Sequence, residues 1–281
     1  MATGRELHLY LPAGPVQPRR LLDVLPSLGL SEDRWMAGVT WEPTVCRALY
    51  TDNETVCATG DINITPIECQ PWVVQVPFRI VDAMKYTHLD LTFDEVETRL
   101  EAFYNRAVSA AFARELISGA ASTGAALSKQ ATAPVDQAFG SAAVPVWNAL
   151  ATLEEEIALR LQGGVGYIFL TPGLLAQAAL SYRLILVGDH WETPSGNWVI
   201  SDAGFVDPTP PTGQAASGVN KDWMYASGPV YVQSSGPTLV GEGSETYRFT
   251  RDTFIEWIEG YGILVFDPCP VTAVLASYAL D

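Results

Sequence analysis

The longest regular pattern of apolar residues lies between residues 92 and 119, and it predicts a single long helix. Apolar side chains recur there every three or four residues, which is the spacing of one helix face. They are Phe93, Val96, Leu100, Phe103, Ala107, Ala111 and Leu116. Thr92 and Glu95 have the spacing of a capping box, and Gly119 suits the left-handed end of a helix. At 1.5 Å per residue this helix would be roughly 39 Å long, so we expect a rod on which other elements pack.

Short alternating or β-branched runs predict strands on both sides of this helix. Residues 46–91 contain several such runs, and we expect a long hairpin within residues 46–75. Pro77 interrupts the last of these runs, which indicates an edge strand or a bulge. After the helix, the expected strands are 167–170, 184–188, 197–201, 223–232, 245–249, 262–266 and 271–276.

Shorter helices are predicted at four further places. Arg20–Leu28 favours a short helix, Pro145–Leu161 a longer one, and Thr171 with Pro172 marks a helix start. A short helix is also expected at Arg251–Glu259. The stripe of the second helix comprises Trp147, Leu150, Leu153, Ile157 and Leu161, and Glu154–Glu156 is interpreted as a solvated face. Residues 120–133 are small and show no apolar period, so we interpret them as a flexible connector.

The order of these elements predicts an α+β protein. Residues 1–45 are rich in proline and read as an extended arm that lies on another surface. Residues 134–222 are predicted to form a lobe between the long helix and the final strands. Residues 207–220 are expected as a surface loop, and 194–196 as a turn.

The charge of the chain argues against a protein that grips nucleic acid. Sixteen basic residues against 32 acidic ones give a formal net charge of −16, and only three of the basic residues are lysines. Direct binding to DNA relies on clustered Lys and Arg that release counterions, and the only basic pair is Arg19–Arg20. The N-terminus has no signal-peptide pattern and no run of about 18 apolar residues is present, so we expect synthesis in the cytoplasm and no membrane span.

Residues with catalytic or metal-binding chemistry form no recognisable motif. The cysteines are Cys46, Cys57, Cys69 and Cys269; none forms a Cys-x-x-Cys pair, and we expect reduced thiols. The histidines are His8, His88 and His190, with no metal-ligand spacing. Asp189, His190 and Ser195 are near one another in sequence, and a soluble hydrolase built on them is an alternative. However, they fall in an expected hairpin turn without a Gly-x-Ser-x-Gly elbow. We therefore predict no catalytic residues, no cofactor, no metal and no enzyme.

The order of the elements and the local sequence of several of them resemble the major capsid proteins of tailed bacteriophages, whose Hong Kong 97-type fold is shared with encapsulins. The helix at 92–119 resembles the spine helix of that family, residues 46–75 its extended loop, and 134–222 its axial domain. Residues 223–232 and 261–275 resemble strands of actinobacterial-phage head proteins. The resemblance implies an N-terminal arm at 1–45, a peripheral domain at 76–133, and peripheral strands that return at 223–281.

This resemblance implies a structural subunit that self-assembles as pentamers and hexamers into an icosahedral capsid around double-stranded DNA. The protein would be made in the host cytoplasm and reside in the virion. Its further partners would be portal, scaffolding and decoration proteins, with only non-specific lumenal contact to the packaged DNA. None of the three lysines lies in the predicted hairpin, so we expect no Lys–Asn crosslink between subunits. An encapsulin-like compartment that encloses a cargo enzyme is the alternative within the same fold.

Overall fold

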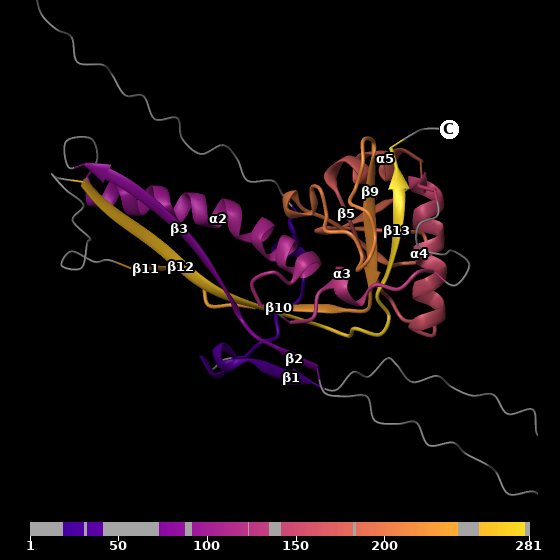
Figure 1. Cartoon of the computed structure of the whole chain (residues 1–281), viewed down its shortest axis with the longest axis horizontal. Helices are drawn as coiled ribbons and strands as arrows, with labels where there is room; N and C mark the ends of the chain where they lie inside the picture. Colours follow the sequence, from indigo (N-terminus) through magenta and orange to yellow (C-terminus); the bar gives the residue numbers. More distant parts are fainter. Residues whose placement is uncertain are drawn as a thin grey trace, which may run out of the picture.

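A computed structural model of the 281-residue chain contains two regions that share one core. It describes residues 19–30, 33–41, 73–87, 92–122, 124–134, 142–181, 184–240 and 253–278. Residues 1–18 of the predicted arm, 46–72 of the predicted hairpin and the strand predicted at 245–249 lie outside these ranges. Figure 1 shows an elongated region, in which a long helix follows a sheet, beside a second region with a sheet and its own helices. The predicted α+β class is confirmed.

The predicted long helix is confirmed as α2, Phe93–Ser118, which has 26 residues. The amide of Glu95 donates to Thr92 Oγ1 at 3.4 Å, and the amide of Thr92 donates to Glu95 Oε2 at 2.9 Å. These two hydrogen bonds are the predicted capping box, and the bond from the Thr92 backbone is the main cause that lowers the pKa of Glu95. Gly119 adopts φ 54° and ψ 37° and ends the helix. Local sequence signals alone therefore fix both ends of this element.

Helix α2 lies along a four-stranded antiparallel sheet centred on β12, Thr253–Phe266 (Figure 1). Strand β12 pairs with β10 (Val230–Ser234), β11 (Thr238–Val240) and β3 (Phe78–Thr87). The prediction of a helix at 251–259 is wrong, because residues 253–259 belong to this strand. From residue 255 to 262, half-buried and buried positions alternate as they do in a strand. The long ladder with β3 is the tertiary context that decides between the two structures.

Two glycines of β12 allow aromatic side chains of α2 to approach the sheet closely. A methyl group on Gly260 would overlap the Tyr104 hydroxyl, and one on Gly262 would overlap the ring of Phe112. Tyr104 and Phe112 are buried and lie two helical turns apart, whereas Phe103, which was predicted on the apolar face, is 44% exposed. The buried face of α2 is thus rotated from the predicted one toward the residues that fit over the glycines.

The run that Pro77 interrupts forms two strands rather than one. Strand β2, Val73–Gln75, ends before Pro77, and β3 begins after it. Strand β2 pairs antiparallel with β1, Val39–Trp41, which follows the 3-10 helix η1, Asp33–Ala37. Because Trp41 lies opposite Val73, the two ends of the 31-residue segment 42–72 are held side by side.

The second region contains a seven-stranded mixed sheet in the order β4-β13-β9-β5-β8-β7-β6. Its strands are β4 (Val144–Pro145), β5 (Tyr167–Leu170), β6 (Ile185–Val187), β7 (His190–Glu192), β8 (Trp198–Ser201), β9 (Lys221–Ser227) and β13 (Thr272–Ser277). Helices α4 (Val146–Arg160) and α5 (Pro172–Ser181) pack on one face. Strands β9 and β13 belong to this sheet, although residues 223–281 were expected to return to the first region. The division between the sheets therefore does not fall at residue 222.

Helices α4 and α5 confirm two predicted helices but correct one predicted face. Thr171 caps α5, since its Oγ1 accepts a hydrogen bond from the amide of Leu174 at 3.3 Å. On α4, Trp147 is 45% exposed although it was expected in the apolar stripe. Glu156 is 3% exposed instead of solvated, and Arg160 Nε lies 2.7 Å from its Oε2. The ion pair with Arg160 explains how a carboxylate can take a core position.

The segment at 120–133, predicted as a flexible connector, is packed. It contains α3 (Leu127–Gln130), and Leu127 is fully buried. Buried Glu115 accepts hydrogen bonds from the amides of Ala121 and Ser122 at 3.0 and 2.8 Å. Buried Gln75 donates to Ser122 Oγ at 3.1 Å. These contacts join the end of α2, the following loop and β2, so polar side chains order a segment that lacks an apolar pattern.

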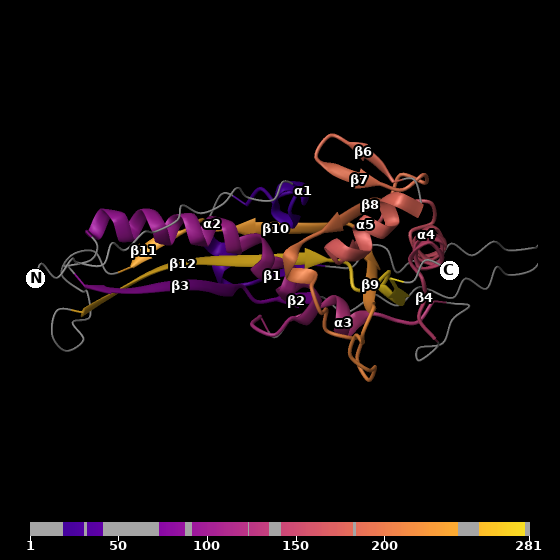
Figure 2. The ribbon, with the colours of Figure 1, turned by 90° about the horizontal axis from the view of Figure 1, so that it is seen from above.

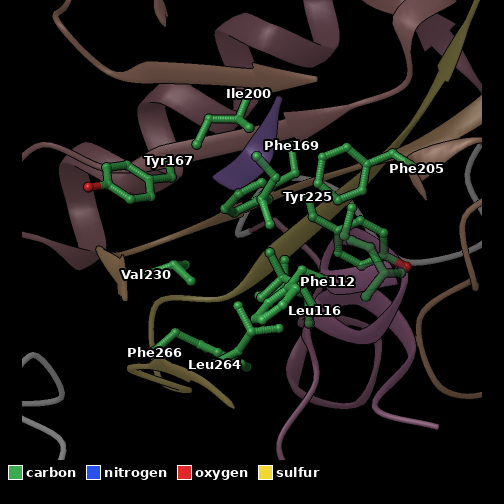
Figure 3. Packing of buried hydrophobic residues seen from close by; sticks show 14 of the residues in the cluster. Phe112, Leu116, Tyr167, Phe169, Ile200, Phe205, Tyr225, Val230, Leu264 and Phe266 are labelled. Carbon is green, nitrogen blue, oxygen red and sulfur yellow. The ribbon is translucent and has the colours of Figure 1, made fainter. Parts of the chain in front are cut away.

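One hydrophobic cluster joins the two regions (Figure 3). Phe112 and Leu116 of α2 meet Phe169 of β5 and Leu264 of β12 in it. Alternate residues of β5 serve different clusters, since Phe169 faces this core while Ile168 faces α4 and α5. Two direct strand-to-strand connections also cross between the sheets: Gly228 and Pro229 connect β9 to β10, and residues 267–271 connect β12 to β13. Since β9 pairs with β13 and β10 with β12, the crossings belong to one bent two-stranded ribbon.

Candidate functional site

The residues of the hydrolase alternative are not arranged as a catalytic triad. His190 lies in strand β7, not in the polar turn that was predicted for it. Its Nδ1 is 2.9 Å from Asp189 Oδ1, and its Nε2 is 2.9 Å from Glu192 Oε1. Both ring nitrogens therefore face carboxylates, which leaves no base for Ser195 in its exposed turn. The ring also stacks on Trp198 with centroids 4.0 Å apart, and this packing fixes its orientation.

A cavity of about 240 Å³ lies beside His190, where the start of the described chain meets β7, β8 and α5. Its lining residues are Arg19, Val24, Leu175, His190, Trp191, Val199 and Ser201. Ser201 Oγ is buried and has no hydrogen-bond partner among the described residues. The hydrogen bond from His190 lowers the pKa of Asp189, and the charge of Arg19 adds a smaller effect. The cavity offers no nucleophile with an adjacent free base, so it supports no acyl-transfer chemistry.

A buried polar junction joins the N-terminal helix to both regions. Asp202 Oδ2 accepts hydrogen bonds from the Leu21 amide at 3.0 Å and from Ser109 Oγ at 2.6 Å. Asp202 Oδ1 accepts one from the Gly204 amide at 3.0 Å, inside the 3-10 helix η2, Ala203–Phe205. Asp202 is 2% exposed and Ser109 is fully buried. The junction therefore fixes α1 (Leu21–Val24) against α2 and the end of β8.

Arg20 adds a second attachment of α1 to the long helix. Its Nη1 donates to the Asn105 carbonyl at 2.7 Å, and its Nε lies 3.2 Å from Asp23 Oδ2. Neither Arg20 nor Asp202 belongs to a recognisable sequence motif. Arg20 and its partner Asn105 are 85 residues apart in the chain, and Asp202 and its partner Leu21 are 181 residues apart. Only the fold brings these groups together, and no local pattern could have identified them.

Several large apolar side chains remain exposed on this single chain. They include Val74, Val76, Trp147, Leu159, Leu180, Ile185, Leu186 and Val187. Strand β6 contributes three in a row, with exposed fractions of 54%, 43% and 41%. Exposed apolar side chains that gather on one element, as on β6, are a feature of surfaces that interact with other proteins.

The remaining predicted chemistry gives few candidates. Cys269 is disulfide-bonded, which corrects the expectation of a reduced thiol. His8 and His88 lie outside the described residues. In the described ranges no group of histidine, cysteine and carboxylate side chains could hold a metal ion. None of the helices in those ranges is both long enough and apolar enough to cross a membrane.

Comparisons with solved structures find a similar arrangement of elements in a GTA capsid, in a phage chain and in an encapsulin complex. The capsid of a native GTA particle matches with a TM-score of 0.54 and 11% identity, covering 99% of this chain and 96% of that one. A chain of Gordonia phage Cozz matches with a TM-score of 0.56 and 10% identity, covering 100% of this chain and 92% of that one. The holo-SrpI encapsulin complex from Synechococcus elongatus PCC 7942 matches with a TM-score of 0.55 and 12% identity, covering 98% of this chain and 92% of that one. This chain has the Hong Kong 97-type capsid fold.

The fold predicted from sequence is thus confirmed, while the sequences themselves have diverged almost completely. Neither a protein-family model nor a curated protein sequence matches the chain. At 10–12% identity these likenesses establish the fold and no specific activity. The matches cover at least 92% of the chain in both directions, so this chain has about the length of the chains that it resembles.

Proposed function

We propose that this protein is a shell subunit that self-assembles as pentamers and hexamers into an icosahedral capsid around a double-stranded DNA genome. The observation that carries the proposal is the match over at least 92% of both chains to the capsid of a GTA particle and to an encapsulin. A subunit that resembles shell proteins over its whole length leaves little of the chain for another activity. On this proposal the protein is not an enzyme, and it resides in the virion capsid.

The exposed surface and the charge both support assembly. Apolar side chains on β2, α4, α5 and β6 would gain stability when neighbouring subunits remove them from water, at about 25 cal/mol per Å² of apolar area. The net charge of −16 would keep free subunits soluble. An acidic lumen would also let packaged DNA lie against the shell without tight binding, since no basic cluster is present to release counterions.

The parts of the chain would take the roles known for this fold. Residues 1–45 would form the N-terminal arm and 46–75 the extended loop, both lying over neighbouring subunits. Residues 76–133, with the spine helix, and the sheet around β12 would form the peripheral domain. The lobe at 134–222 would be the axial domain at the centre of each capsomer, now with β9 and β13 as two of its strands. Portal, scaffolding and decoration proteins would be the further partners.

Two alternatives make different predictions. An encapsulin-like compartment has the same fold, and only the contents of purified particles, DNA or a cargo protein, separate it from a capsid. The hydrolase alternative is disfavoured because both nitrogens of His190 are engaged by carboxylates. It would return if His190→Ala abolished a hydrolytic activity of the purified protein.

Negative-stain electron microscopy with size-exclusion chromatography tests the proposal directly. We expect closed icosahedral shells, or pentamers and hexamers far above the 30.4 kDa of one chain. Trp72→Ala in the predicted extended loop should leave folded subunits that fail to assemble, whereas Trp147→Phe, which keeps an aromatic side chain, should assemble normally. A protein that stays monomeric, with and without a co-expressed scaffold, would refute the shell function.

A further inference from the structure

The cavity beside His190 is lined by parts of the chain that are far apart in sequence. Its volume is about 240 Å³, and its walls come from the start of α1, strands β7 and β8, and helix α5. Figure 2 shows α1 and the β6–β7 hairpin on the same side of the molecule. Since a water molecule takes about 30 Å³ of liquid volume, the cavity has room for about eight waters or for a small organic molecule.

Most of the wall of this cavity is apolar. Val24 of α1, Leu175 of α5, Trp191 of β7 and Val199 of β8 are four of its seven lining residues. Sites for small molecules are typically lined by apolar side chains, with a few polar groups that fix the orientation of the ligand. The apolar wall therefore favours an occupant with a hydrocarbon body over an inorganic ion.

Ser201 contributes a polar group that the described chain does not use. The residue is only 5% exposed and lines the cavity. Its Oγ has no hydrogen-bond partner among the described residues. The next residue, Asp202, is held by hydrogen bonds from three other residues, so the backbone at this point is fixed. A buried hydroxyl without a partner is unfavourable, because it has lost its hydrogen bonds to water. A ligand in the cavity could supply the missing bond.

Arg19 contributes a positive charge without a counter-charge. It lines the cavity and forms neither an ion pair nor a hydrogen bond with another described residue. The hydrogen bond from His190 is the main cause that lowers the pKa of Asp189, and the charge of Arg19 contributes least. A guanidinium group carries five N–H donors and no acceptor, so its natural partner is an anion with two oxygens.

The carboxylates near the cavity do not fill this role. Oδ1 of Asp189 lies 2.9 Å from Nδ1 of His190, and Oε1 of Glu192 lies 2.9 Å from its Nε2. The Asp189 side chain is 66% exposed, so it lies at the surface and not inside the cavity. The imidazole has no nitrogen left for a ligand. The polar groups that remain for a ligand are therefore the Arg19 guanidinium and the Ser201 hydroxyl.

We propose that this cavity binds a small monocarboxylate with an aliphatic or aromatic body. The carboxylate would accept hydrogen bonds from Arg19 and from Ser201 Oγ, and the body would lie against Leu175 and Val199. One carboxylate charge matches the one unpaired guanidinium. Phosphate, with a charge of about −1.5 to −2 at pH 7, would leave charge uncompensated beside apolar walls. The inference concerns a single chain and does not depend on shell formation.

Equilibrium dialysis with radiolabelled hexanoate tests the site on the full-length protein, in free subunits and in assembled particles alike. Hexanoate has about eight non-hydrogen atoms and so fits the volume of the cavity. We expect saturable binding of one hexanoate per chain. Hexanamide has the same shape without the charge, and it should compete at least about tenfold less well, as should inorganic phosphate.

Three variants separate a specific site from non-specific binding. Arg19→Met should weaken hexanoate binding about tenfold or more, and Ser201→Ala about two- to tenfold. Ser201→Ala should leave the thermal unfolding of the ligand-free protein unchanged, since the hydroxyl has no partner to lose. Arg114→Met removes the same charge at an exposed position of α2 outside the cavity lining and should bind hexanoate as the wild type does. No saturable binding to the wild type, or equal binding by Arg19→Met, would overturn the proposal.

Discussion

Replacing Gly262 by alanine tests how closely α2 packs against the sheet at strand β12. Glycine in the interior of a strand is normally a weakness, because it loses the most conformational entropy on folding. If the space above Gly262 were open, Gly262→Ala would stabilise the protein by about 0.4–1 kcal/mol. The structure predicts the opposite sign, because the ring of Phe112 occupies that space.

The contact geometry sets the size of the effect. A methyl carbon on Gly262 would overlap Phe112 Cζ and lie 2.7 and 2.9 Å from Cε1 and Cε2 of the ring. Carbon atoms pack best at about 3.5–4.0 Å, so the ring or the strand must move by roughly 1 Å. Phe112 is fully buried and packs edge-on against Phe78, with ring centroids 4.9 Å apart. Overpacking of this kind costs about 1–3 kcal/mol, and we expect a loss in that range.

Thermal and urea unfolding followed by circular dichroism would measure this loss, with each variant compared in the same assembly state. Gly228→Ala is the comparison variant, because its nearest side-chain atoms lie at 3.3 and 3.5 Å, so that a methyl group requires a shift of only a few tenths of an ångström. Phe112→Ala should itself cost about 3–5 kcal/mol. In that background Gly262→Ala should cost nothing further, since the clash is gone. A Gly262→Ala protein as stable as the wild type would refute the close approach of α2 to β12.

Two further predictions follow from buried polar groups. Asp202→Ala removes the acceptor of three hydrogen bonds, so we expect the free energy of unfolding to fall by about 3 kcal/mol or more. Trypsin should also cleave faster at Arg20. Unchanged cleavage would contradict the attachment of α1 through Asp202. Burial, with an added effect of Glu256 on Tyr86, raises the pKa of Tyr86 and of Tyr167 from 10 to about 12. Because these folded-state pKa values are raised, their stabilisation is intact below pH 10 and is lost as the pH rises to 12, by up to about 1.4 kcal/mol per pH unit for each tyrosine. Titration of tyrosinate absorbance should therefore lag behind that of the unfolded chain, and a simple titration at pH 10 would contradict this expectation.

The parts of the fold that sequence predicted correctly are those that local interactions determine. Helix α2 has its capping box, its left-handed glycine and its apolar period within one continuous stretch. Strand β5 and helix α5 were likewise marked by an apolar run followed by Thr171 and Pro172. In each case the residues that stabilise the element are neighbours in sequence, so the pattern carries the information.

The errors arise where distant residues decide the structure. Strand β12 was mistaken in part for a helix because its partner β3 lies about 170 residues earlier in the chain. The segment 120–133 looked flexible because it is ordered by Glu115 and Gln75, which hydrogen-bond to backbone and hydroxyl groups instead of forming an apolar stripe. The role of Asp202 could not be predicted, since its hydrogen-bond partners Leu21 and Ser109 are distant in sequence and come close to it only in the folded chain.

The bent ribbon that crosses between the two sheets makes the connection between the two regions stiff. Its shorter crossing has only two residues, Gly228 and Pro229, and the hydrophobic cluster packs around both crossings. A force at the far end of α2 therefore rotates the second sheet together with the first, because no flexible linker separates the two sheets at these connections. With an arm of roughly 39 Å, a tilt of about 3° at the crossings moves the tip of the helix by about 2 Å. Small changes of angle between the two regions are thus converted into displacements of a few ångströms at the far end of the long helix.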